Sequence, residues 1–291
     1  FTDRYFLLTH YHKDHLSGFK HIIKTHPDYF SRVFLPFMPV GNSNNADILD
    51  FAVFAHVFMS FQTDCSNINT SCIKAFELIY GNVSAARLFT LKSGDTFSFD
   101  KSEYEVLWPP EKGFEFTPEL TDAVEQLNII YASPFAYDFE REFFHLKNDF
   151  IKTYLKCCQA NSVNDRTLPH ERHRLSERLI DLLDKINLLK SQLNESKRAH
   201  DVRDILTDPV VSQAFSDSVN MSSLVFHNIR TSSPGIQDVL MTGDCMPEVI
   251  SKIQDKLYDG YYVLKAPHHG TSSGYSPIFN DMAFSHILIS N

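Results

Sequence analysis

The stretch LLTHYHKDHLSGF, from Leu7 to Phe19, places three histidines and an aspartate within six positions. It follows the run Arg4–Thr9, which is aromatic and aliphatic without alternation, a pattern typical of a strand buried on both faces. Apolar residues at helical spacing come next, from Leu16 to Ile23, and His26 and Pro27 close that pattern. The sequence therefore predicts a polar cluster at the carboxyl end of a strand, immediately before a helix.

The cluster has the composition of a metal site. His10, His12, Asp14 and His15 form the pattern H-x-H-x-D-H. Because alternate residues of an extended segment point the same way, His10 and His12 can bind one ion, and the following turn lets Asp14 and His15 reach a second. Imidazole nitrogen and carboxylate oxygen together suit Zn or Mn better than Ca. We expect two divalent metal ions, Zn or Mn.

Outside this cluster, segments typical of strands and helices alternate along the chain, and this α/β pattern is interrupted once. Long polar and charged segments with helical periodicity and few glycines run from 112 to 219, and β character returns afterwards. We expect a domain made of residues 1–111 and 220–291, with a helical insertion at 112–219. The strands expected outside the insertion cover 32–37, 88–91, 96–99, 104–107, 222–229, 238–244, 261–266 and 286–291, and the helices cover 45–61 and 246–257.

The insertion contains a heptad-like seam of six apolar residues spaced alternately four and three apart, from Leu175 to Leu193. Two interpretations stay open. The seam could pack a helical hairpin onto itself or onto the neighbouring domain, or it could bind a second copy of the chain or a protein partner.

Composition argues against some classes of protein. The chain has 291 residues, 43% of them hydrophobic, and a formal net charge of −9, so a polyanion would need a local basic patch or metal ions to bind. No apolar run reaches the ~18 residues that a membrane span requires. The odd number of cysteines and their spacings fit free thiols in a reducing compartment, and we expect a cytoplasmic protein. The cysteines are Cys65, Cys72, Cys157, Cys158 and Cys245.

Four segments together resemble a known family. Thr9–Gly18, THYHKDHLSG, is similar to the signature of the metallo-β-lactamase fold, a four-layer αββα sandwich that usually carries a two-metal hydrolytic site. VLMTGD, ending at Asp244, resembles the strand and aspartate that bridge both ions in that family. VLKAPHHG, Val263–Gly270, resembles the hydrolase domain of the bacterial DNA-uptake competence channel protein and its standalone relatives, as does Leu91–Pro110. The resemblance covers residues 1–111 and 220–291.

The resemblance implies roles for the polar residues. His10 and His12 would hold the first metal, Asp14 and His15 the second, and Asp244 would bridge them.

Two adjacent histidines complete this implied site. We expect His268 to bind a metal and His269 to donate a proton to the leaving group or to contact a phosphate. Asp14 would orient a hydroxide held between the two ions.

The chain also departs from the wider family. Where a third histidine ligand of the first metal is expected, before the strand SSLVF, Asn220 and Ser222 stand instead. His227 lies within that strand, and we expect it to be structural. The strands that normally precede the histidine signature are not present in this sequence, so we expect them to have been trimmed or to come from another chain.

These features lead to three functional hypotheses. The first is a metal-dependent phosphodiesterase or nuclease. If its activity depended on a partner, it could be an effector in defence against phage. The second is a hydrolase of small esters, lactones or thioesters, since the same metals serve carbonyl chemistry. The third is an assembly component that uses the helical insertion to join a complex.

Overall fold

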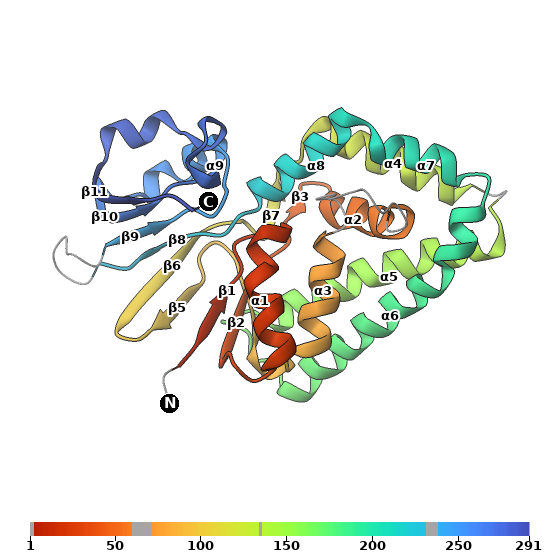
Figure 1. Ribbon diagram of the computed structural model, residues 1–291, viewed down its shortest axis with the longest axis horizontal. Coiled ribbons are helices and arrows are strands. Elements are labelled where there is room, and N and C mark those ends of the chain that lie inside the picture. Colours follow the sequence, from red (N-terminus) through yellow and green to blue (C-terminus); the bar gives the residue numbers. More distant parts are fainter. Residues whose placement is uncertain (1–2, 60–70, 134–135, 231–237, 291) are drawn as a thin grey trace.

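The computed structural model describes residues 3–59, 71–133, 136–230 and 238–290. It is a mixed α/β structure, in which strands gather on one side and a body of helices on the other (Figure 1). The helices are α1 (Lys13–Thr25), α2 (Asp47–Phe58), α3 (Ser71–Asn82), α4 (Pro118–Ala132), α5 (Asp138–Ala160), α6 (Pro169–Glu195), α7 (Ala199–Thr207), α8 (Pro209–Met221) and α9 (Pro247–Lys252).

The first sheet is parallel and has the order β1-β2-β4. Its central strand alternates its apolar side chains between two cores, because Val33 and Leu35 face one side and Phe34 the other. α1 packs Leu16 and Phe19 into the same core as Val33, so this helix covers one face of the sheet. The strands are β1 (Tyr5–Leu7), β2 (Arg32–Pro36) and β4 (Leu88–Leu91).

The second sheet is mixed and has the order β11-β10-β9-β8-β6-β5. It is antiparallel from β5 to β9 and parallel from β9 to β11, with Val239 opposite Val263. A separate parallel pair joins β3 to β7. The strands are β5 (Thr96–Phe99), β6 (Ser102–Trp108), β8 (Val225–Asn228), β9 (Val239–Met241), β10 (Gly260–Lys265), β11 (Ala283–Leu288), β3 (Val40–Gly41) and β7 (Lys112–Phe114).

The two sheets pack face to face. Phe34 and Leu91 of the first sheet share a core with Phe97 and Val106 of the second. Leu107 alternates to the opposite face of the second sheet, where α9 covers it. The order of layers along this part of the molecule is therefore helix, sheet, sheet, helix.

The helical region is not a separate unit. Its helices enclose α2, which is apolar on all sides and has every residue buried except Asp50. Phe54 contacts Tyr131 and Phe143, and Phe51 contacts Phe215. One continuous core therefore joins the first part of the chain to the helices from Pro118 to Met221.

The heptad-like seam lies inside this core. Leu179, Leu182, Ile186 and Leu193 are each at most 1% exposed, and α6 packs against α5, α2 and α3. The interpretation as a helical hairpin is thus the one the structure supports, and the seam is not an exposed surface for a second copy or a partner.

Most expected elements are present, but β3, β7 and α3 differ from the expected set. β7 lies inside the predicted insertion and pairs with β3, so the helical run starts only at Pro118. α3 has no counterpart among the expected elements. Cys72, Cys157, Cys158 and Cys245 are free and buried, whereas Cys65 lies outside the described residues. Within the described ranges, no helix combines the length and apolarity needed to cross a bilayer.

Candidate metal centre

The predicted site residues meet where three strands end. His10 and His12 follow β1, Asp244 follows β9, and His268 and His269 follow β10. Backbone contacts join these segments: Leu224 N–H donates to the Thr9 carbonyl at 2.8 Å, and Asp244 N–H donates to Ser223 Oγ at 3.1 Å.

Gly243 allows this close approach. Its φ is +55°, and a Cβ at this position would lie 3.0 Å from Ser223 Cβ and 3.1 Å from Thr9 Cβ. A side chain at residue 243 would therefore push the Asp244 loop away from the histidine loop.

Four ligand atoms from Asp14, His15, Asp244 and His269 lie close together. Asp14 Oδ2 lies 3.5 Å from His15 Nε2 and 3.3 Å from His269 Nε2. Asp244 Oδ2 lies 3.4 Å from the same His15 nitrogen and 3.0 Å from the His269 nitrogen. Ligands of a tetrahedral ion with bonds of about 2.0–2.1 Å are separated by about 3.3 Å. The four measured distances are close to this separation, and the ligand atoms of Asp14, His15 and His269 lie within 4.8 Å of one another, as a site for one divalent ion requires.

The two adjacent histidines lie in the opposite arrangement to the one expected. His269 Nε2, and not a nitrogen of His268, lies beside both carboxylates, whereas His268 Nδ1 lies 3.2 Å from Ser273 Oγ. The reason is the backbone: His268 and His269 have φ values of 46° and 57°, both in the left-handed region. A pattern of residue types cannot predict which ring such a turn directs inward.

A second group of ligand atoms adjoins the first. His10 Nε2 and His12 Nδ1 lie 3.0 Å apart, and both residues are at most 9% exposed. Ligand atoms of His10, His15 and Asp244 lie within 4.8 Å of one another. Asp244 therefore has ligand atoms close to residues of both groups.

The pKa values of His10, His12 and Asp244 are shifted in the directions that favour metal binding. Burial lowers the pKa of His12 to about 4, and burial together with His12 and His15 lowers the pKa of His10 well below its usual value. Burial alone would raise the pKa of Asp244, but the His15 hydrogen bond, His10 and Lys265 outweigh it and hold that pKa well below its usual range. Neutral imidazole and ionised carboxylate are the forms that bind metals.

Lys265 is a neighbour that sequence reasoning missed. Its Nζ donates to the Gly243 carbonyl at 2.7 Å and to Asp244 Oδ1 at 3.1 Å. The other oxygen of Asp244, Oδ2, is the one that faces His15 and His269. Lys265 therefore orients this carboxylate.

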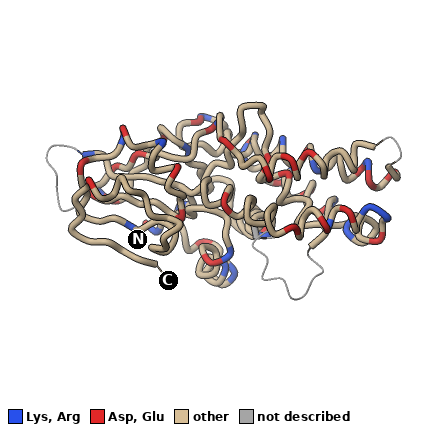
Figure 2. Tube along the Cα trace, turned by 90° about the horizontal axis from the view of Figure 1, so that it is seen from above, with Lys and Arg blue, Asp and Glu red and all other residues tan. Residues whose placement is uncertain are grey.

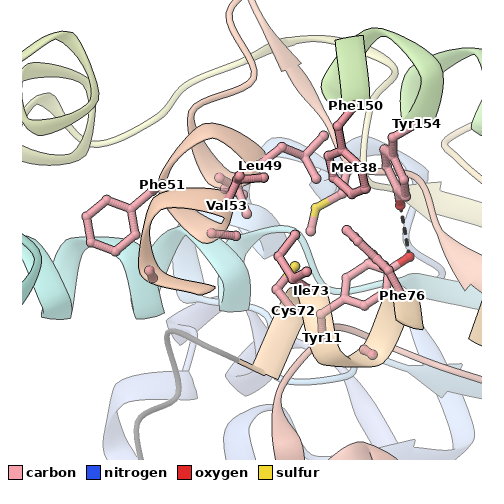
Figure 3. Packing of buried hydrophobic residues seen from close by; sticks show 14 of the residues in the cluster. Tyr11, Met38, Leu49, Phe51, Val53, Cys72, Ile73, Phe76, Phe150 and Tyr154 are labelled. Carbon is pink, nitrogen blue, oxygen red and sulfur yellow. Dashed lines mark hydrogen bonds between the residues drawn. The ribbon is translucent and has the colours of Figure 1, made fainter. Parts of the chain in front are cut away.

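Tyr11 anchors the histidine loop in the core. It points away from His10 and His12, is fully buried, and donates to the Pro36 carbonyl at 3.3 Å. Its hydroxyl lies 3.1 Å from the Tyr154 hydroxyl on α5 (Figure 3). The helical region thus helps to fix the positions of both histidines.

A cleft of about 530 Å³ opens over the site. The helical region forms one wall of it, since Gln213, Ser216 and Asn220 on α8 line the cleft at a spacing of three and four residues. This polar face is present in the sequence, but only the fold shows that it meets the histidines. The other lining residues are His12, Lys13, Asp14, Ser17, Asp244, His268 and His269.

His227 lies apart from this cleft, as expected of a structural residue. It is buried in β8, its Nδ1 is 2.8 Å from the Tyr261 hydroxyl, and its ring stacks on Tyr258.

Comparison of this chain with known proteins identified no relative. No protein-family model, curated protein or solved structure matches this chain.

Proposed function

We propose that this chain is a two-metal hydrolase of the metallo-β-lactamase type that cleaves phosphodiester bonds. The observation that carries the proposal is the cluster of ligand atoms in which Asp14 and Asp244 each lie 3.0–3.5 Å from His15 and His269. The order of helix, sheet, sheet, helix supports the family assignment.

The residues fit two divalent ions. His10 and His12 would bind the first, Asp14, His15 and His269 the second, and Asp244 both. When bound, two such ions lower the pKa of water toward neutrality and stabilise negative charge on the substrate.

The surroundings favour an anionic substrate. Lys13 lines the cleft, and α1 begins at this residue, so the positive end of the helix dipole adds to its charge. A phosphodiester develops anionic charge in its transition state, which the ions and this helix end would stabilise. His268 also lines the cleft and is the histidine left to donate a proton to the leaving group.

The size of the cleft favours a compact substrate. A volume of about 530 Å³ is within the range of small-molecule sites. Acidic and basic residues are interspersed along the described chain (Figure 2), which fits a short phosphodiester or a nucleic-acid end better than a long duplex.

The test is hydrolysis by metal-free protein reloaded with Mn or Zn. The substrates are bis(p-nitrophenyl) phosphate, single-stranded DNA, RNA, plasmid DNA and p-nitrophenyl acetate. His12→Ala and Asp244→Ala remove ligands, and His173→Ala, an exposed histidine on α6, is the matched control.

We expect metal-dependent phosphodiester cleavage that both ligand substitutions abolish and the control retains. Hydrolysis of the carboxylic ester alone would favour the second hypothesis, a hydrolase of small esters. Absence of all hydrolysis by a protein that binds two ions would contradict the proposal.

A further inference from the structure

Two residues that line the cleft, His12 and Asn220, each have a buried side-chain atom without a hydrogen-bond partner among the described residues, and only Asn220 lacks an expected role at the metal site. Asn220 is 3% exposed, and its Oδ1 is buried without a hydrogen bond to any part of the chain that the structure describes. A buried amide oxygen without a partner is unfavourable, and such atoms need an explanation.

The position of Asn220 is fixed by its surroundings. It lies in the last turn of α8, where Trp108 Nε1 donates to the Met221 carbonyl at 2.6 Å. The Asn220 carbonyl accepts from Ser223 N–H at 2.9 Å, and Ser223 in turn binds the Asp244 loop. Its side chain lines the same cleft as His12 and Asp244.

The first metal site has room for one more ligand. His10 Nε2 and His12 Nδ1 lie 3.0 Å apart, and a ligand oxygen of Asp244 lies within 4.8 Å of a His10 nitrogen. These three residues would supply three donors, and divalent ions of this kind take four or more. We propose that the side-chain oxygen of Asn220 is a ligand of the first metal ion, so that the helical region completes the metal centre. This inference rests on the proposed two-metal function.

The proposal has a consequence for metal choice. An amide oxygen is a harder donor than the imidazole expected at this position, and carbonyl oxygens suit Mn better than imidazole does. The first site should therefore accept Mn more readily than a site with three imidazoles.

The test measures metal binding and not turnover. Metal-free wild type, Asn220→Ala and Asn220→Asp are titrated with Mn²⁺ by calorimetry and with Co²⁺ by visible absorption. Gln213→Ala, on the same face of α8, is the control. Thermal unfolding of each metal-free protein separates folding from binding.

We expect wild type, Gln213→Ala and Asn220→Asp to bind two ions. In Asn220→Ala one ion should bind at least about tenfold more weakly, with an altered Co²⁺ spectrum, while the metal-free melting temperature does not fall.

Two results would overturn the inference alone: unchanged binding of both ions by Asn220→Ala, or a lower metal-free melting temperature in this variant and in Asn220→Asp, which would make Asn220 structural. Failure of wild type to bind any ion would instead overturn the proposed function.

Discussion

At the scale of single residues, the two adjacent histidines after β10 have different surroundings. Both line the cleft, but His269 contacts Asp14 and Asp244 whereas His268 contacts Ser273. Under the proposed function His269 would be a metal ligand and His268 a proton donor, so their substitutions should separate metal binding from turnover.

We predict that His269→Asn weakens binding of one metal ion by at least about tenfold. His268→Asn should bind both ions as wild type does and lower kcat about 10²–10⁴-fold. Calorimetry and steady-state kinetics on bis(p-nitrophenyl) phosphate check this pair, in which each variant controls for the other. Loss of an ion from His268→Asn, with both ions kept in His269→Asn, would restore the roles first expected from the sequence.

The sequence predicts part of this site and not the rest. The H-x-H-x-D-H spacing is local, so His10, His12, Asp14 and His15 could be predicted to come together, whereas Asp244 is expected beside them only because VLMTGD resembles a segment of the metallo-β-lactamase fold. The histidine that faces the carboxylates depends on two left-handed residues, and the place of Asn220 depends on helix packing. Neither is visible in a short pattern.

At the scale of elements, α2 and α6 meet at a buried polar contact. His56 on α2 is 2% exposed, with its Nε2 2.9 Å from Asn187 Oδ1 and 2.7 Å from Lys190 Nζ on α6. Burial and the charge of Lys190 lower the pKa of His56 to about 3. Below pH 6.5 the unfolded chain takes up a proton at this residue that the folded chain does not.

His56 should therefore reduce stability as the pH falls from 6.5 toward 3. We predict that the difference in free energy of unfolding between wild type and His56→Gln changes by up to about 3 kcal/mol between pH 6.5 and pH 4, in favour of the variant. Urea unfolding at a series of pH values measures it. Other titrating histidines are common to both proteins and cancel in the difference. A difference that is constant with pH would contradict this account of the contact.

The same elements show what periodicity can predict. The spacing from Leu175 to Leu193 predicts a helix with an apolar face, and α6 has one. It cannot say whether that face binds another chain or its own neighbours, because both satisfy the same pattern. The presence of α2 favours packing within the chain. α2 has apolar residues on all sides that must be buried, and α6 buries part of them.

At the scale of the whole molecule, the helical region and the sheets should form one folding unit. Phe51, Phe54 and Phe58 of α2 pack against Tyr131, Phe143 and Phe215 of the helical region. Exposing three buried phenylalanines costs about 5–9 kcal/mol, which compares with a total stability of about 5–15 kcal/mol. The interpretation of residues 112–219 as an insertion into a known type of domain suggests, on the contrary, that this segment can be removed without unfolding the rest.

Replacing residues 112–219 with a short Gly-Ser linker distinguishes these possibilities. The ends of the segment are close, as the Trp108–Met221 hydrogen bond shows, so a short linker adds little strain. We predict that the shortened chain aggregates or lacks a cooperative unfolding transition, because α2 loses its cover. The same linker inserted between Asp165 and Arg166, both exposed, should leave folding unchanged. Size-exclusion chromatography and circular dichroism provide the readout. A monomeric, cooperatively folding product would show that the sheets with α1, α2 and α3 are stable by themselves.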